Sequence, residues 1–364
     1  MFDITLKTKE ILKGSIIKST SGINLYTPDG MGNYRELWTR DFAYMVEYAG
    51  ELMPKEDIKA CLEYLMNGAA ENGWIPDRVE EDGNPRYTAG DYDFPGLPNL
   101  DNGPFLVIAA DAYFNMLSEE EALALYEEWK GILFKGIECL PKNEDGLIYN
   151  DEEAAHSPYG FTDCIRKTGL LSMETLLLWR AWKILAKWQR KTGKPCAESE
   201  KEIEKIENAF CKTFMSECGM LYAATQTCKQ IDVWASCYAV SIGFPLGENA
   251  SKIAKWLIDH IDEISDHGQI RHLPKDEYWE RTFVPVENGT YQNGAFWAVA
   301  TGWAYDAIVS YDKKTAQRLL NETLEYFDKY GIYECINGEY KKLDTYVASL
   351  TNIYDTYKKN KKMQ

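Results

Sequence analysis

Two kinds of helical hydrophobic pattern alternate along this chain. In the first kind, apolar residues recur every three or four positions and charged residues fill the opposite face, as in residues 198–215, "ESEKEIEKIENAFCKTFM". In the second kind, apolar residues surround the helix almost completely, as in residues 102–117, "NGPFLVIAADAYFNML". A helix that is apolar on every side must be buried on every side. The chain is therefore predicted to alternate surface helices with interior helices.

Six segments of each kind are present. The surface segments lie near residues 8–18, 54–70, 119–140, 198–215, 248–264 and 313–330. The interior segments lie at residues 40–50, 102–117, 169–186, 232–244, 293–309 and 345–357. Their starts are 60, 62, 69, 62 and 52 residues apart when measured at Asp41, Asp101, Asp163, Asp232, Gly294 and Tyr346. This spacing is typical of a repeated helical pair.

The repeat predicts an all-α fold, an (α/α)6 toroid in which six outer helices enclose six inner ones. A closed ring leaves no terminal repeat with its apolar face exposed to water. No clear run of strands is found and no Pro/Ser-rich linker divides the chain, so residues 1–364 are predicted to form a single domain. In such a ring the inner helices begin at one end, and the loops that precede them share one rim.

Charge and composition exclude several classes of function. The net charge of -17 repels nucleic acid and anionic membrane surfaces. No apolar run approaches the roughly 18 residues of a membrane span, and the first ten residues contain no apolar signal region, so a cytoplasmic location is expected. Nine cysteines without a C-x-x-C pair and four histidines without an H-x-x-x-H pair predict neither a metal nor a cofactor.

Chemically versatile residues gather before the interior segments. Examples are "ELWTRDF" (36–42), "ENGWIPDR" (71–78) and "HSPYGFTDCIRKTG" (156–169), whereas the surface helices begin with ordinary Glu, Lys and Asn. The chain also has 11 tryptophans and 24 tyrosines, whose flat rings can stack on sugar rings. Carboxylates, arginines, amides and aromatic rings converging on one rim indicate a deep binding pocket.

Four of these segments resemble motifs of the six-hairpin glycosidases, a superfamily that includes the glucoamylases and the neutral/alkaline invertases. "LWTRDF" resembles their sugar-binding Trp-x-Arg-Asp segment, and "GFTDCIRKTGLLSMETLLLWRAW" resembles the segment that holds the general acid. "TYQNGAFW" is similar to an invertase motif in which Gln292 replaces histidine. "YGIYECINGEY" followed by "YVAS" resembles the glucoamylase segment with the general base. The motifs occur in the same order on the same repeats.

The resemblance implies an inverting glycoside hydrolase that acts on a neutral, glucose-type oligosaccharide. It assigns the general acid to Asp163 and the general base to Glu334, because glycosidic cleavage requires one protonated and one ionised carboxyl group. The invertase pattern instead places the second carboxylate at Glu277 or Glu280, and the sequence leaves this choice open. The residues expected to bind the sugar are Trp38, Arg40, Asp41, Trp74, Asp101, Asn102, Arg271, Tyr291, Gln292, Asn293 and Trp297.

Structural roles compete with several of these assignments. Asp163 is of a residue type preferred at helix N-caps, and Asp101 with Asn102 also suits a cap. Arg40 and Asp41 match an ordinary ion pair at a helix start. Other such alternatives are a core position for Trp297 and a solvated loop position for Arg271.

Other functions also remain open at this stage. A phosphorylase of the same fold would use Arg166, Lys167, Arg271 and Arg281 to bind phosphate. A sugar epimerase would need facing histidines, against which four scattered histidines argue. A non-catalytic sugar-binding protein is the alternative from another class. The oligomeric state is not predicted.

Overall fold

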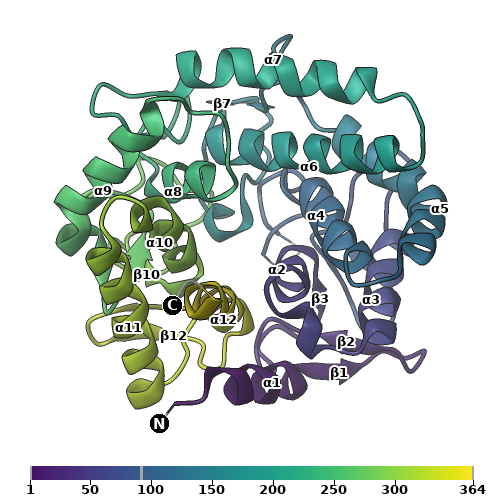
Figure 1. The fold of residues 1–364 in the computed structure, drawn as a ribbon, viewed down its shortest axis with the longest axis horizontal. Helices are drawn as coiled ribbons and strands as arrows, with labels where there is room; N and C mark the ends of the chain where they lie inside the picture. Colours follow the sequence, from purple (N-terminus) through teal and green to yellow (C-terminus); the bar gives the residue numbers. More distant parts are fainter. Residues whose placement is uncertain (1, 91–92, 363–364) are drawn as a thin grey trace.

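Twelve α-helices form two concentric rings in the computed structural model, which describes residues 2–90 and 93–362 (Figure 1). The inner helices are α2 (Thr39–Ala49), α4 (Asn102–Phe114), α6 (Ser172–Lys191), α8 (Val233–Ser241), α10 (Thr301–Val309) and α12 (Val347–Lys362). The outer helices are α1 (Ile4–Gly14), α3 (Lys55–Asn67), α5 (Glu119–Glu138), α7 (Ala197–Phe214), α9 (Asn249–Ile264) and α11 (Lys313–Tyr330). The predicted all-α (α/α)6 toroid is confirmed.

The inner ring is closed. Each inner helix packs against the next one along the chain, and α12 packs against α2. The N-terminal helix α1 also packs against the C-terminal helix α12, as Figure 1 shows at the bottom of the ring. Closure therefore buries the apolar faces of the first and last repeats against each other. An open array would leave these faces exposed to water, which is why a ring was predicted.

Burial separates the two kinds of helix as their hydrophobic patterns predicted. Ten of the eleven residues of α2 are buried, because this helix is surrounded by other helices. Only six of the eighteen residues of α11 are buried, and they lie on the one face that contacts the inner ring. None of the helices in the described ranges has the length and apolar character that crossing a membrane requires.

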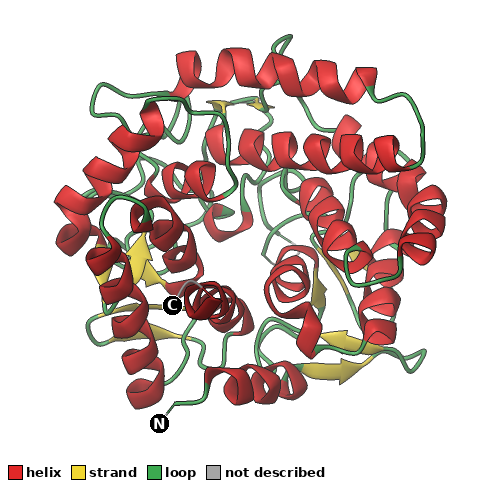
Figure 2. Ribbon diagram, in the orientation of Figure 1, coloured by secondary structure: helices red, strands yellow, loops and turns green. Residues whose placement is uncertain are grey.

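Short strands occupy the loops at the inner-helix starts, which differs from the expectation of no strands (Figure 2). They are β1 (Ile16–Lys18), β2 (Asn24–Tyr26), β3 (Leu37–Trp38), β4 (Arg78–Val79), β5 (Pro85–Arg86), β6 (Tyr149–Asn150), β7 (Gly169–Leu170), β8 (Ser265–Asp266), β9 (Gln269–Arg271), β10 (Phe296–Trp297), β11 (Cys335–Asn337) and β12 (Tyr340–Lys342). The largest sheet has the order β12-β11-β10-β9-β8, with antiparallel pairs. Strands of two or three residues are too short to show an alternating pattern.

Three predicted helix boundaries differ in the structure, two of them because of these strands. The fifth inner helix begins at Thr301 instead of near Gly294, because Phe296 and Trp297 pair with β9 and a 3-10 turn (Ala298–Ala300) follows. The third inner helix begins at Ser172, after β7 has paired with β6. The first outer helix begins at Ile4 instead of residue 8, and the Asp3 side chain accepts a hydrogen bond from the Leu6 backbone there.

A glycine contact holds the second inner helix against its outer partner. A Cβ atom added to Gly103 in α4 would lie 1.9 Å from the carbonyl oxygen of Gly136 in α5. We expect Gly103→Ala to lower the free energy of unfolding by about 1–3 kcal/mol, because the two backbones would have to separate. Gly131, on the exposed side of α5, has no atom within 4 Å of such a Cβ. The control Gly131→Ala should therefore stabilise the protein by about 0.5–1 kcal/mol. Urea unfolding tests both values, and equal effects would contradict the packing described.

Candidate active site

A cavity of about 210 Å³ lies where the loops before several inner helices meet. Three carboxyl groups that are far apart in the sequence share this cavity, because Asp41, Asp163 and Glu334 all line it. The described residues that line it are Pro28, Tyr34, Trp38, Arg40, Asp41, Gly90, Gly160, Phe161, Asp163, Cys164, Tyr291, Glu334 and Tyr346. The predicted convergence of the inner-helix starts on one rim is therefore observed.

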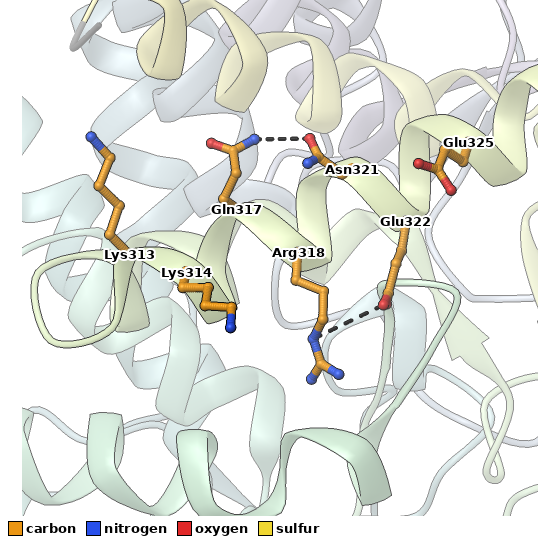
Figure 3. A pocket seen from close by; sticks show the side chains of 7 residues that line it. All are labelled: Lys313, Lys314, Gln317, Arg318, Asn321, Glu322 and Glu325. Atoms are coloured by element: carbon orange, nitrogen blue, oxygen red, sulfur yellow. Dashed lines mark hydrogen bonds and ion pairs between the residues drawn. The ribbon is translucent and has the colours of Figure 1, made fainter.

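A larger depression of about 1010 Å³ lies on the outer helix α11, but it lacks the character of a binding site. Figure 3 shows that all of its labelled side chains come from this one helix, and the interactions drawn between them join neighbours, Gln317 with Asn321 and Arg318 with Glu322. No second element supplies an opposing wall among the residues that line it. The buried cavity at the inner-helix starts is the better candidate.

Asp163 is held by an amide side chain from another repeat. Its side chain is 7% exposed, and its Oδ1 accepts a hydrogen bond of 2.8 Å from Gln292 Nε2. Burial raises the pKa of the Asp163 carboxyl, and the nearby Arg40 guanidinium opposes that rise. The alternative in which Asp163 caps the third inner helix is wrong, because α6 begins at Ser172. Asp163 instead follows a single 3-10 turn (Gly160–Thr162).

Gln292 fixes the backbone on both sides of Asp163. Its Nε2 also donates to the Gly160 carbonyl oxygen at 3.1 Å, and its Oε1 accepts from the Cys164 backbone N–H at 2.9 Å. Gln292 is not among the residues that line the cavity, and these hydrogen bonds of its side chain are all to the loop that carries Asp163. Gln292 is therefore a residue that orients Asp163.

Glu334 faces the cavity directly before strand β11. Its side chain is almost fully buried, and its Oε1 accepts a hydrogen bond of 3.2 Å from the Tyr34 hydroxyl. The ammonium group of Lys342 lies 3.4 Å from its Oε2. Burial raises the pKa of Glu334 to about 7, the Lys342 charge opposes this rise, and the nearby Asp41 carboxylate adds to it.

Arg40 lies between two buried carboxylates from the next repeat. Its guanidinium is 3.5 Å from Asp77 Oδ1 and 3.3 Å from Asp101 Oδ2, and its side chain is only 3% exposed. Burial raises the pKa of Asp77 to about 7 and of Asp101 to about 6, although Arg40 opposes both shifts. The ion-pair partners of Arg40 are thus Asp77 and Asp101 from the next repeat, instead of the neighbouring Asp41 that the helix-start alternative supposed. Gly160 lies directly against Arg40, since an added Cβ would be 1.5 Å from the Arg40 Cζ.

Asp41 is a third buried carboxyl group on the wall. The Tyr346 hydroxyl donates a hydrogen bond of 2.6 Å to its Oδ1. Burial raises its pKa, and the neighbouring Arg40 opposes the shift. Within the described ranges, no group of three or more His, Cys, Asp or Glu side chains is arranged to hold a metal ion.

Seven residues proposed to bind sugar from sequence lie outside the cavity lining, and two of them, Asp101 and Gln292, are described above. Trp74 stacks on His156 with ring centroids 4.9 Å apart, and Arg271 donates to the Glu277 carbonyl oxygen. The others are Asn102, Asn293 and Trp297, which hydrogen-bond respectively to the Ile75 carbonyl, the Trp279 backbone N–H and the Tyr291 carbonyl. Trp297 occupies a core position, as its structural alternative anticipated.

The two alternative bases also lie away from the cavity. Glu277 and Glu280 are exposed, and Glu280 Oε2 accepts a hydrogen bond of 3.0 Å from the Cys228 backbone. Neither is among the residues that line the cavity, whereas Glu334 is. The geometry therefore favours Glu334 over the two alternatives.

Sequence reasoning missed several residues that build this site, among them Lys342 beside Glu334. Tyr34 and Tyr346 hold the carboxyl groups of Glu334 and Asp41, and Asp77 pairs with Arg40. Arg78 stacks on the Trp38 ring, with its guanidinium carbon 4.6 Å from the ring centroid. A usable signal was the "PDR" of residues 76–78, because it places Asp and Arg together before an inner helix one repeat after residues 40–41.

Solved structures of similar fold include a mannosylglycerate hydrolase and a rhamnosidase. A GH63 mannosylglycerate hydrolase from Thermus thermophilus in complex with glucose aligns with a TM-score of 0.72 and 13% identity, over 97% of this chain and 99% of that chain. A rhamnosidase from Klebsiella oxytoca with rhamnose bound aligns with a TM-score of 0.67 and 11% identity, over 100% of this chain and 65% of that chain. No protein family profile matches this sequence, and a search of curated proteins finds no match.

These likenesses establish the fold. The (α/α)6 fold that the resemblance to the six-hairpin glycosidases implied is therefore confirmed. An uncharacterized conserved protein from Thermus thermophilus aligns over similar lengths, with a TM-score of 0.69 and 14% identity. At such low identity, residue roles must be argued from this chain's own geometry.

Removing the Arg40 charge should destabilise the protein in a pH-dependent way. We expect Arg40→Met to lower the free energy of unfolding by about 3–5 kcal/mol at pH 8, because Asp77 and Asp101 would stay buried without their shared cation. Without it their pKa values would rise further, so the folded state would bind protons more readily and part of the loss should be recovered at pH 5.5.

Urea unfolding of this variant at the two pH values provides the measurement. Arg318→Met, which removes a partly exposed ion pair with Asp262, is a suitable control and should cost about 0–1 kcal/mol at either pH. An equal loss at both pH values in Arg40→Met would contradict the proposed electrostatic origin.

Proposed function

We propose that the protein is an inverting glycoside hydrolase, with Asp163 as the general acid and Glu334 as the general base. One observation carries this proposal: two carboxyl groups with raised pKa values, from different repeats of the ring, face the same buried cavity. Glycosidic cleavage needs such a pair, and environments that shift carboxyl pKa values are typical of catalytic sites. The named glycosidases of the same fold add independent support.

In the proposed reaction Asp163 gives its proton to the glycosidic oxygen while the bond between that oxygen and the anomeric carbon breaks. Glu334 takes a proton from a water molecule whose oxygen bonds to the anomeric carbon from the opposite face. The anomeric configuration is therefore inverted. The cycle leaves Asp163 ionised and Glu334 protonated, and exchange with solvent restores both groups.

The protein environment supports this division of roles. Burial raises the pKa of Asp163, which favours the protonated form that an acid requires, and the hydrogen bond from Gln292 fixes its orientation. The Lys342 ammonium and the Tyr34 hydroxyl both favour the ionised form of Glu334, as a base requires. The Asp41 carboxylate and the Arg40 guanidinium are suited to bind sugar hydroxyl groups as acceptor and donor.

The size of the cavity favours a small substrate group. Sites for drug-sized ligands measure about 300–1,000 Å³, whereas this cavity measures about 210 Å³. We infer that it encloses one sugar ring, and we propose a neutral, glucose-like unit because the wall already carries three carboxyl groups. An anionic sugar would be repelled by them.

Phosphorolysis receives less support than hydrolysis. Among the four cations considered for phosphate binding, Arg166 and Arg281 both contact Glu152. Lys167 is fully buried beside Glu174, and Arg271 donates to a backbone carbonyl. None of the four is among the residues that line the cavity. Sugar release in phosphate-free buffer would distinguish the two reactions.

The roles of the two carboxyl groups can be separated with leaving groups of different acidity. We expect Asp163→Asn to lower kcat/KM on a disaccharide by about 10²–10⁴-fold, but on a 2,4-dinitrophenyl glycoside by less than about tenfold, because that leaving group needs no proton. Glu334→Gln should lower kcat/KM on both substrates by about 10²–10⁴-fold, because both need an activated water.

The measurement starts from a screen of disaccharides and aryl glycosides, followed by NMR of the first product to identify its anomer. Cys164→Ser, at a wall position next to Asp163, is the control for damage to the cavity. Full activity in both carboxyl variants, or retention of anomeric configuration, would contradict the proposal.

Lys342 should set the acid limb of the pH profile. As the base, Glu334 must be ionised, so kcat/KM should rise with pH through about 7. Lys342→Met removes the charge that favours the ionised form, so the pKa of Glu334 and the acid limb should both move upward by about one pH unit. The neighbouring exposed Lys341 lies over the Tyr330 and Tyr333 rings, and Lys341→Met should leave the limb in place. A downward shift in Lys342→Met would refute Glu334 as the titrating base.

A further inference from the structure

One carboxylate oxygen holds both ends of the loop that carries Asp163. Glu174, in the first turn of α6, accepts a hydrogen bond of 2.7 Å from the Tyr159 backbone N–H through its Oε1. The same Oε1 lies 3.2 Å from Lys167 Nζ. Residues 159–167 therefore form a loop whose beginning and end meet at one atom, with Asp163 near its middle.

The contact at the end of this loop is buried completely. The side chains of Lys167 and Glu174 are both 0% exposed. The Lys167 ammonium forms no hydrogen bond within the described residues, and the Trp279 ring lies 5.7 Å from its Nζ. Asp232 also acts on it electrostatically. A lysine in this position is costly unless its charge is paired, and a simple apolar residue of similar length would avoid that cost.

The middle of the loop is fixed by side chains from other repeats. The Gly160 backbone N–H donates to Asp101 Oδ2 at 2.8 Å, and Gln292 contacts Gly160, Asp163 and Cys164. Those contacts hold only residues 160–164. The far end is also held through its backbone, because Asn150 Nδ2 donates to the Lys167 carbonyl oxygen at 2.7 Å and the Arg166 N–H donates to the Arg281 carbonyl oxygen. The Lys167–Glu174 pair adds a side-chain connection from residue 167 to the Tyr159 N–H at the near end.

We propose that Lys167 and Glu174 are positioning residues that hold Asp163 at the distance from the substrate that proton transfer requires. Neither side chain lines the cavity, so they act through the loop and not on the substrate. This inference rests on the proposed role of Asp163 as the general acid. It also gives Lys167 a role other than the phosphate binding that its charge suggested. A displacement of about 1 Å at such a group can reduce the rate by about 10²-fold.

The test uses the double variant Lys167→Met/Glu174→Gln, because single substitutions leave an unpaired buried charge and can unfold the protein. Gln keeps an oxygen for the Tyr159 N–H, and Met keeps the bulk of the lysine stem, so the double variant should fold. Circular dichroism and urea unfolding check that it does. The loop loses only the ionic connection between its two ends.

We expect the double variant to have a kcat about 10–100-fold lower on a disaccharide, with KM nearly unchanged, because proton delivery fails while binding remains. On a 2,4-dinitrophenyl glycoside, which needs no acid, kcat should fall by less than about threefold. A role limited to stability would lower the rates on both substrates to the same extent.

The matched control lies at the other end of α6. Arg190 and Glu200 form an ion pair of 2.8 Å whose side chains are 56% and 49% exposed. Arg190→Met/Glu200→Gln should change neither kcat. If the Lys167→Met/Glu174→Gln variant keeps full kcat on the disaccharide, or loses equally on both substrates, the positioning role is overturned while the proposed hydrolysis stands. If the unaltered protein hydrolyses neither substrate, the proposed function and this role both fail.

Discussion

The buried charge of Arg40 is the constraint on which the candidate site depends. A guanidinium cannot stay in a protein interior without anionic partners, and here Asp77 and Asp101 supply them. Gly160 packs directly against the same guanidinium, which is possible only because glycine lacks a side chain. Arg40 thus joins the first inner helix, the loops before the second and the loop before the third. The position of Asp163 follows from that junction, since it is three residues after Gly160.

The closed ring explains why residues so distant in the sequence can act together. Asp41, Asp163 and Glu334 belong to the first, third and sixth repeats, and each lies before or in the first turn of an inner helix. Because all inner helices begin at one end, these three carboxyl groups face one cavity. The ring also excludes water around them, and this burial is the largest cause of their raised pKa values. The architecture therefore brings the three carboxyl groups together and raises their pKa values.

The fold was predictable from the sequence because each repeat carries two different hydrophobic patterns. The short strands were not, since pairs such as Phe296–Trp297 with β9 leave no periodic signal in two residues. In the candidate site, the motif residues Arg40, Asp41, Asp163 and Glu334 could be proposed from their positions before inner helices. Tyr34 could not be singled out in the same way, because its importance arises from its contact with Glu334, which lies 300 residues away in the sequence.

A crystal structure after a glucose soak tests the central claim most directly, because it locates the sugar without assuming any reaction. The account predicts one ring in the cavity of about 210 Å³, with its anomeric carbon between Asp163 and Glu334 and the two carboxyl groups about 6.5–9.5 Å apart, as direct attack by water requires. A ring bound only elsewhere, for example on the outer helix α11, would contradict it. So would a carboxyl separation of about 5 Å, which belongs to the retaining mechanism.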